Sequence, residues 1–134
     1  MTRSFRSKFP LRMDIALLVF RVWICTALFM KHGLEKVLHF QDMPGHFPDP
    51  IHIGARVSFY FAFFTDAVCS VLVAAGLLTR LAAFLIVINL FVVFGFMHHF
   101  NFHEDHAELV FVYLGGFVTL VLTGAGRFSV DAQL

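Results

Sequence analysis

The amino-acid sequence predicts an all-α integral membrane protein, a bundle of four transmembrane helices with both termini in the cytoplasm, in a single domain of residues 1–134. Three observations predict this fold class: the composition, four long apolar runs and the distribution of basic residues. Hydrophobic residues make up 59% of the chain and charged residues 14%. Soluble chains are roughly 45–50% apolar and about 25% charged, so both values are typical of a membrane protein.

Four apolar runs are long enough to cross the hydrocarbon core of a bilayer, which takes about 17–25 helical residues. They lie at about residues 15–30, 57–78, 81–97 and 107–123. Their apolar residues are continuous rather than alternating, which predicts helices, because a helix satisfies its own backbone hydrogen bonds in lipid. Residues 41–54 contain three of the four prolines and are expected to form a loop. The short link Thr79-Arg80 predicts a hairpin of antiparallel helices.

The distribution of lysine and arginine predicts the orientation of these helices. Arg3, Arg6, Lys8, Arg12, Arg80 and Arg127 flank one side of the predicted spans, and Lys31, Lys36 and Arg56 flank the other. Cytoplasmic segments carry an excess of basic residues, so both termini are expected to be cytoplasmic. All 8 histidines then lie in or beside the two outer loops.

Charged residues inside the spans are expected to face the bundle, because a charge at the bilayer centre costs roughly 2.5–3.5 kcal/mol on insertion scales. Arg21 in the first span and Asp66 in the second predict an ion pair between helices. This pair either holds the two helices together or helps to handle a proton or a ligand. One stripe of the first span carries four polar residues at helical spacing: Asp14, Arg21, Cys25 and His32.

Three further residues within the spans have alternative interpretations. Cys25 and Cys69 lie at similar predicted depths, roughly 18 and 15 Å from the cytoplasmic ends at about 1.5 Å per residue. They are either small inert hydrophobes or a redox pair. Asn89 is expected to form a hydrogen bond between helices rather than to contact a ligand.

A group of imidazole and carboxylate side chains falls in or next to the third loop. It consists of His98, His99, His103, His106 and Glu108. Imidazole with carboxylate suits zinc, iron or manganese, so these residues form a candidate metal site. The HExxH signature is absent from the sequence. Two other interpretations stay open: proton exchange beside a ligand, and interfacial histidines that have no chemical role.

The order of motifs along residues 11–132 resembles the DoxX/DoxD-like family of bacterial inner-membrane proteins. The matching stretches are His32-Gly33-Leu34-Glu35-Lys36, Phe47-Pro48-Asp49-Pro50, Gly76-Leu77-Leu78-Thr79-Arg80-Leu81-Ala82-Ala83, then His99, Glu108 and Tyr113, and finally Gly124-Ala125-Gly126-Arg127-Phe128-Ser129-Val130-Asp131. The resemblance implies a four-helix protein associated with quinone-linked redox chemistry, similar to the membrane subunit of thiosulfate:quinone oxidoreductase or to members that accompany oxidative-stress proteins. This chain departs from the family in carrying Asp66 where a glutamate is usual, and in a histidine-rich third loop.

The predicted function is therefore that of a membrane subunit of a quinone-linked or oxidative-stress-related oxidoreductase system in the bacterial inner membrane. It would bind a lipophilic redox molecule near the outer end of the bundle. His99, Glu108 and His32 are the predicted catalytic residues, which serve the polar head by hydrogen bonding or proton exchange. The predicted cofactor-binding residues are Arg21, Asp66, Lys36 and Tyr113. The expected cofactor is a quinone, and a divalent metal is a second candidate.

The sequence contains no haem, flavin or iron–sulfur motif, so a partner redox protein is expected to supply the electron-transfer cofactor. One alternative function is a non-catalytic membrane anchor or assembly subunit for a partner protein, and another is a metal-binding or small-solute transport protein. Small residues permit close approach of helices within the bundle or in a homo-oligomer; they are Ala74, Ala75, Gly76, Gly115 and Gly116. A net charge of +1 argues against nucleic-acid binding.

Overall fold

The computed structural model of the protein describes residues 10–45, 47–49, 51–97, 101, 103 and 107–133. Its helices are α1 (Leu11–Leu28), α2 (Leu34–Leu38), α3 (Ala55–Phe63), α4 (Ser70–Ala75), α5 (Thr79–Val92) and α6 (Ala107–Thr123). Three π-helical turns, η2 (Phe29–Gly33), η3 (Phe64–Cys69) and η4 (Val93–Met97), and a short 3₁₀ turn, η5 (Asp131–Gln133), complete the regular structure. These described residues include no β-strand, which confirms the predicted all-α class.

Three of the helical segments are long and apolar enough to cross a membrane, judged by length and composition. They are Leu11–Leu38 with 28 residues, Ala55–Ala75 with 21 and Thr79–Met97 with 19. The remaining apolar helix, α6, is shorter, with 17 residues. Large apolar side chains are exposed on the helix surfaces, including Trp23 at 77% and Leu122 at 74%. Such surfaces suit contact with lipid, so the protein is a membrane protein.

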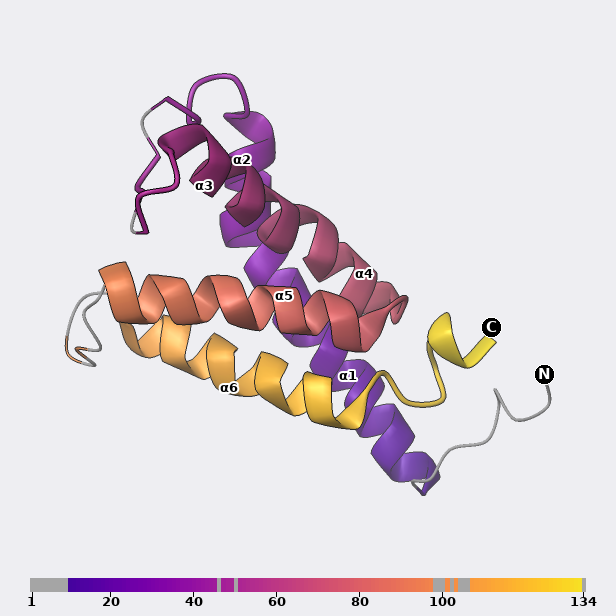
Figure 1. The fold of residues 1–134 in the computed structure, drawn as a ribbon. Helices are drawn as coiled ribbons and strands as arrows, with labels where there is room; N and C mark the ends of the chain where they lie inside the picture. The colour runs from indigo at the N-terminus through magenta and orange to yellow at the C-terminus, as the bar shows by residue number, and fades with distance from the viewer. Residues whose placement is uncertain are drawn as a thin grey trace.

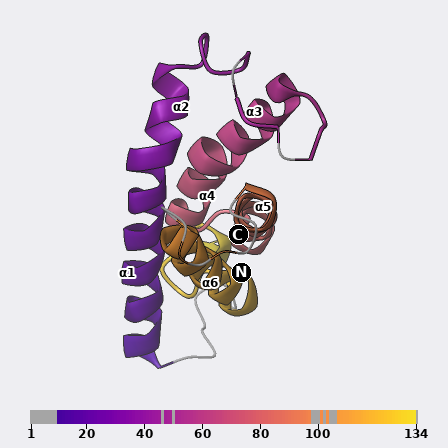
Figure 2. The ribbon, with the colours of Figure 1, turned by 90° about the vertical axis from the view of Figure 1, so that its left-hand side faces the viewer.

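The α5 and α6 helices lie across α1 rather than alongside it. In Figure 1, α5 and α6 run side by side in a direction different from that of α1 and α2. In Figure 2, α1 is seen from the side, whereas α5 and α6 are viewed nearly down their axes. At Gly116 of α6, an added side chain would collide with Ile24 of α1, so this glycine permits close contact where the helices cross.

The C-terminal segment contacts both α1 and the start of α5. We call this region, formed by Asp14, Arg21 and residues 124–133, the clasped end. The Asp131 carboxylate accepts hydrogen bonds from the backbone N–H groups of Leu78 (2.8 Å) and Thr79 (3.0 Å). These donors begin α5 and have no partner within the helix, so a distant residue acts as the N-terminal cap. The Arg127 N–H donates to the Asp14 carboxylate (3.1 Å).

The Arg21 guanidinium is buried at the clasped end and donates to three backbone carbonyl oxygens. The distances are 3.2 Å to Ala74, 2.6 Å to Ala125 and 2.7 Å to Phe128. Ala74 lies in the last turn of α4, where carbonyl groups lack partners within the helix and the dipole favours a cation. The predicted ion pair between Arg21 and Asp66 is therefore wrong, because main-chain oxygens satisfy this arginine.

The predicted helical hairpin is present, but its connection is Gly76–Leu78 rather than Thr79-Arg80. Gly76 ends α4 in the left-handed conformation, with φ at 78°. The Leu77 N–H bonds the Leu72 carbonyl (2.8 Å), and the Gly76 N–H bonds the Val73 carbonyl (3.0 Å). This pattern is a Schellman motif, which closes a helix where glycine can adopt positive φ.

Removal of the Asp131 carboxylate should weaken the start of α5. We expect Asp131→Ala to lower the free energy of unfolding by about 0.5–2 kcal/mol, the usual cost of losing an N-terminal cap. Denaturant titration in mixed micelles measures this loss. Gln133→Ala, which changes an exposed side chain two residues away, is the matched control; equal stability of the two variants would contradict the capping role of Asp131.

Candidate functional site

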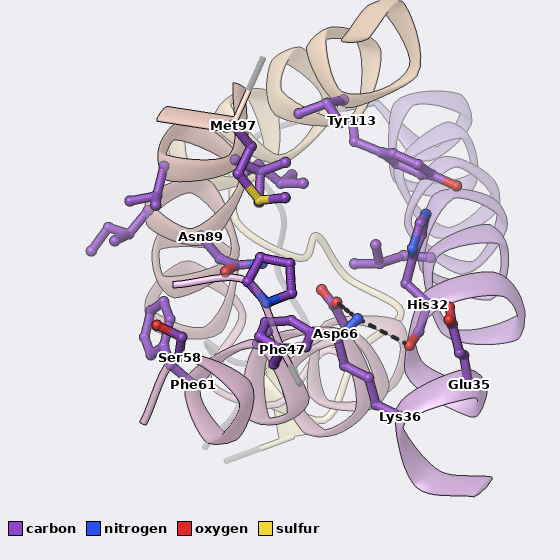
Figure 3. A pocket seen from close by; sticks show the side chains of 18 of the residues that line it. His32, Glu35, Lys36, Phe47, Ser58, Phe61, Asp66, Asn89, Met97 and Tyr113 are labelled. Atoms are coloured by element: carbon purple, nitrogen blue, oxygen red, sulfur yellow. Dashed lines mark hydrogen bonds and ion pairs between the residues drawn. The ribbon is translucent and has the colours of Figure 1, made fainter. Parts of the chain in front are cut away.

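A cavity of about 630 Å³ lies at the end of the molecule opposite the clasped end. We call this the cavity end. Figures 1 and 2 show that α2 and α3 diverge here from α5 and α6. Most lining side chains are apolar, and the polar ones are His32, Glu35, Lys36, Ser58, Asp66, Asn89 and Tyr113. Figure 3 shows His32 and Tyr113 on one side of the cavity and Asn89 and Ser58 on the other.

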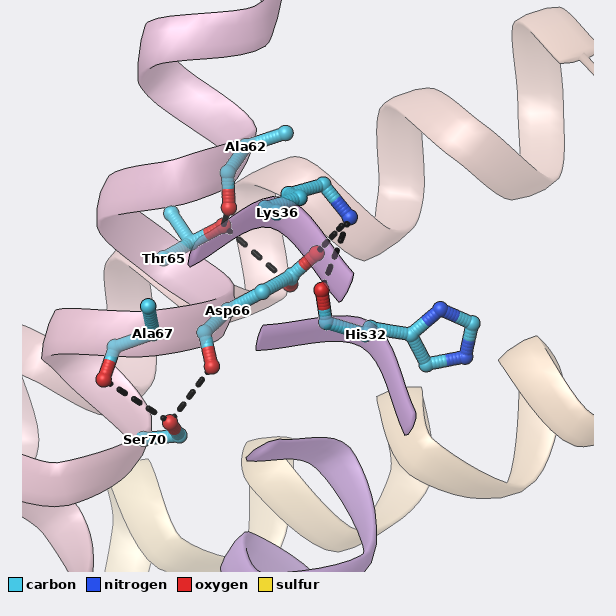
Figure 4. Close-up of polar contacts among 7 residues, drawn as sticks. All are labelled: His32, Lys36, Ala62, Thr65, Asp66, Ala67 and Ser70. Carbon is cyan, nitrogen blue, oxygen red and sulfur yellow. Dashed lines mark hydrogen bonds and ion pairs between the residues drawn. The ribbon is translucent and has the colours of Figure 1, made fainter. Parts of the chain in front are cut away.

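A buried ion pair lies in the wall of this cavity. The Lys36 Nζ is 2.8 Å from the Asp66 Oδ2, and each side chain is only 7% exposed. The same ammonium group lies 3.4 Å from the His32 carbonyl oxygen and 5.7 Å from the centre of the Phe47 ring. Figure 4 shows both polar contacts of Lys36. Its charge is thus compensated inside the protein, as a charge within an apolar environment requires.

The hydroxyl of Thr65 supports the other oxygen of the carboxylate. It lies 3.4 Å from Asp66 Oδ1 and 3.1 Å from the Ala62 carbonyl oxygen. The Ser70 hydroxyl donates to the carbonyl oxygen of Asp66 (2.5 Å), as Figure 4 also shows. Neighbouring hydroxyl groups therefore hold both the side chain and the backbone of Asp66.

The cavity is bordered by all three π-helical turns. His32 belongs to η2, Asp66 to η3 and Met97 to η4, and all three line the cavity. A π turn inserts an extra residue into a helix, and such turns occur frequently at functional sites. Their gathering around one cavity is consistent with a binding site.

Gly33 brings the first two long helices close enough to form the ion pair. A Cβ at this position would lie 2.5 Å from the Asp66 carbonyl oxygen and 3.1 Å from the Ala67 Cα. Lys36 is three residues later, on the same face of the helix. Only a residue without a side chain permits this approach, so Gly33 determines that Lys36 reaches Asp66.

Three of the polar residues that line the cavity are His32, Asn89 and Tyr113. The His32 ring is half-buried and lies against the Tyr113 ring, with ring centres 6.4 Å apart and planes at 83°. Within the described part of the chain, the nitrogens of the His32 ring have no hydrogen-bond partner. Asn89 in α5 is 9% exposed and lines the cavity. The predicted hydrogen bond from Asn89 to another helix stays a prediction.

The loop between α2 and α3 covers part of the cavity. Phe40 packs against Phe59 and Phe63, with ring centres 5.7 and 5.0 Å away, and Phe47 packs against Phe59 at 5.4 Å. Loop residues that line the cavity are Met43, Phe47, Pro48, Ile51 and Ile53. Aromatic contacts thus hold this predicted loop against α3.

Asp49 fixes the second half of the same loop. Its carboxylate accepts hydrogen bonds from the Ile53 N–H (2.9 Å), the Gly54 N–H (2.8 Å) and the Ser58 hydroxyl (2.9 Å). Desolvation on its own would raise the pKa of Asp49, but these hydrogen bonds outweigh it and lower the pKa below the ordinary value of 3.8.

The cavity brings together four of the sequence-predicted site residues: His32, Lys36, Asp66 and Tyr113. Two others, predicted as cofactor-binding and catalytic residues, lie elsewhere. Arg21 is at the clasped end, and Glu108 is exposed in the first turn of α6 and does not line the cavity.

The predicted catalytic residue His99 lies outside the described residues, as do His98 and His106 of the candidate metal site. His103 is described and exposed. Within the described ranges, no group of three or more His, Cys, Asp or Glu side chains is arranged to hold a metal ion. Cys25 and Cys69 are both buried and are not joined by a disulfide.

Ser58 and the role of Asp49 are not among the features predicted from the sequence. One sequence pattern indicates both of them: an aspartate five residues before a glycine at the start of a helix. Asp49 precedes Gly54 in this way, and aspartate commonly accepts hydrogen bonds from backbone N–H groups near a helix start.

Removal of one partner of the buried ion pair should be much more damaging than removal of both. We expect Lys36→Met or Asp66→Asn to lower the free energy of unfolding by about 3–5 kcal/mol, because an unpaired charge or polar group stays buried. The double variant Lys36→Met/Asp66→Leu should recover most of this loss. Denaturant titration in mixed micelles compares the three variants, and additive losses in the double variant would contradict coupling of the two charges.

The Asp49 hydrogen bonds should make stability depend on pH in a defined direction. A carboxyl group whose pKa is lowered on folding stabilises the protein above its unfolded pKa, and the effect is lost as pH falls through the folded pKa. We therefore expect Asp49→Asn to be less stable than the wild type at pH 7, with the difference shrinking below about pH 4. Thermal unfolding at several pH values measures this. Asp42→Asn, an exposed change in the same loop, is the control; a difference for Asp49→Asn that is constant with pH would refute the interpretation.

Comparison with known proteins places the chain in a family. The DoxX family model matches residues 16–99. The matched segment includes most of α1, the helices up to η4, and six of the seven polar cavity residues, all except Tyr113. No curated protein and no solved structure matches the chain. Because the matched segment covers more than half of the sequence, the chain belongs to the DoxX family.

Proposed function

We propose that this chain is a multi-pass protein of the bacterial inner membrane that binds a quinone, or a similar lipophilic redox molecule, as the membrane subunit of an oxidoreductase system. The observation that carries the proposal is the cavity of about 630 Å³, in which an apolar wall surrounds one group of polar side chains. Ligand-binding cavities commonly have volumes of about 300–1,000 Å³ and this mixture of residues.

The proposed topology has four crossings, with both termini in the cytoplasm and the cavity on the outer side. With 17 residues, α6 is at the lower limit for a crossing. The first long helix, Leu11–Leu38, has 28 residues. At about 1.5 Å per residue its length is roughly 42 Å, more than the hydrocarbon core needs, so it tilts or extends beyond the bilayer.

The cavity matches the two parts of a lipophilic quinone. Apolar residues from α3, α5, η4 and α6, including Phe61, Val93, Met97 and Leu109, line it and suit an isoprenoid tail. His32, Asn89 and Tyr113 suit the ring, because each carries a hydrogen-bond donor that a quinone carbonyl accepts.

A bound quinone would supply reversible two-electron, two-proton chemistry. In this arrangement His32 can pass a proton at a ring nitrogen, since a neutral imidazole carries one donor and one acceptor nitrogen. Asn89 and Tyr113 orient the ring by hydrogen bonds, and the Lys36–Asp66 pair holds two helices at the distance that the cavity requires. We expect a partner protein to carry electrons to or from this site. The catalytic roles of His99 and Glu108 stay predictions made from the sequence.

Titration of a short-chain 1,4-benzoquinone onto the protein in mild detergent tests the proposal. We expect saturable binding by calorimetry, and Tyr113→Phe should weaken it by roughly two- to tenfold, the effect of losing one hydrogen bond. His32→Ala should weaken it at least as much. His39→Ala is the matched control, because His39 directly follows α2, is exposed and does not line the cavity.

Absence of saturable binding in the wild type would reject the quinone proposal. If a partner protein nevertheless copurifies with the chain and leaves the membrane when the chain is deleted, the non-catalytic anchor is the correct function. Equal losses in His32→Ala and His39→Ala would show that binding occurs outside this cavity.

A further inference from the structure

We propose, on the basis of the proposed function, that the cavity selects uncharged lipophilic carbonyl compounds and rejects anionic and cationic amphiphiles of the same length. Lys36 and Asp66 bring about this selectivity by cancelling each other's charge within the cavity wall. The inference concerns the class of ligand, which is independent of whether that ligand undergoes redox chemistry.

A lysine in an apolar membrane cavity would ordinarily suggest an acidic ligand, such as a fatty acid. The geometry here argues against this. The Lys36 ammonium has three donors, and it is surrounded by the Asp66 carboxylate at 2.8 Å, the His32 carbonyl at 3.4 Å and the face of Phe47 at 5.7 Å. An entering carboxylate would have to displace Asp66, which would leave that buried group unpaired.

A cationic ligand is disfavoured as well, because the Asp66 carboxylate is already paired. One oxygen of the Asp66 carboxylate bonds Lys36, and the other lies 3.4 Å from the Thr65 hydroxyl. A cationic head would have to compete with a lysine whose side chain is 7% exposed and held in place. The cost of leaving that ammonium group unpaired exceeds the gain of a replacement contact.

The remaining polar groups of the lining suit a neutral acceptor. The His32 ring, the Asn89 amide and the Tyr113 hydroxyl provide donors without a fixed charge. The Ser58 hydroxyl donates to Asp49, and the Glu35 side chain is exposed. The interior of the cavity therefore combines zero net fixed charge with several hydrogen-bond donors.

Three probes with the same alkyl chain test this inference at pH 8, where an ordinary imidazole is uncharged. They are a decyl-substituted 1,4-benzoquinone, decanoate and decylamine, titrated onto the purified wild-type protein in detergent. We expect the neutral probe to bind at least about tenfold more tightly than either charged probe.

Two substitutions should change the selectivity in opposite directions. Asp66→Asn leaves the Lys36 charge unpaired and should improve decanoate binding by about tenfold or more, whereas Lys36→Met leaves Asp66 unpaired and should do the same for decylamine. Asp42→Asn is the control, because Asp42 is exposed and does not line the cavity, so the change removes a charge without touching the ion pair. It should change either ratio by less than about twofold.

The outcomes separate this inference from the proposed function. Wild-type preference for decanoate or decylamine would overturn the charge inference while leaving the cavity as a lipid-accessible binding site. Binding of no probe at all would overturn the proposed function as well. If either single variant does not fold, the wild-type comparison and the double variant Lys36→Met/Asp66→Leu decide: the double variant must keep the preference for the neutral probe.

Discussion

Arg21 places a full positive charge within an apolar helix, and the packing at one end of the molecule provides three oxygen atoms to satisfy it. These oxygens belong to the last turn of α4 and to the segment after α6, so one guanidinium group links α1 to both. Asp131 then links the same segment to the start of α5. With the helices tied together there, their opposite ends are free to diverge, and the cavity lies at that divergent end.

The second constraint is the contact between Gly33 and the backbone of Asp66. It prevents the first two long helices from diverging completely, since it brings them together beside the cavity. The Lys36–Asp66 ion pair forms next to that contact. A backbone contact and an ion pair therefore fix the cavity wall beside Lys36 and Asp66, whereas the wall formed by α5, η4 and α6 is mostly apolar, with Asn89 and Tyr113 as its polar residues.

Sequence patterns predict the helical class, the hairpin and the proline-rich loop well, because apolar runs and prolines act through local chemistry. They also place Lys36 and Asp66 among the candidate site residues. The partners of Arg21 cannot be predicted from the sequence. Its acceptors are backbone carbonyl groups, which every residue possesses. The cap that Asp131 provides to Thr79 is equally hidden, because 52 residues separate the two.

The partners of Arg21 also have a consequence for biogenesis. Ala125 and Phe128 follow this arginine by 104 and 107 residues. At a synthesis rate of about 5–20 residues per second, α1 leaves the ribosome roughly 5–20 seconds before these carbonyl groups exist. During that interval the guanidinium group has to keep its hydration by staying near the interface, or to be sheltered by the insertion machinery. Full insertion of the first helix is thus coupled to the arrival of the segment after α6, so an early step of membrane assembly waits for a late part of the chain.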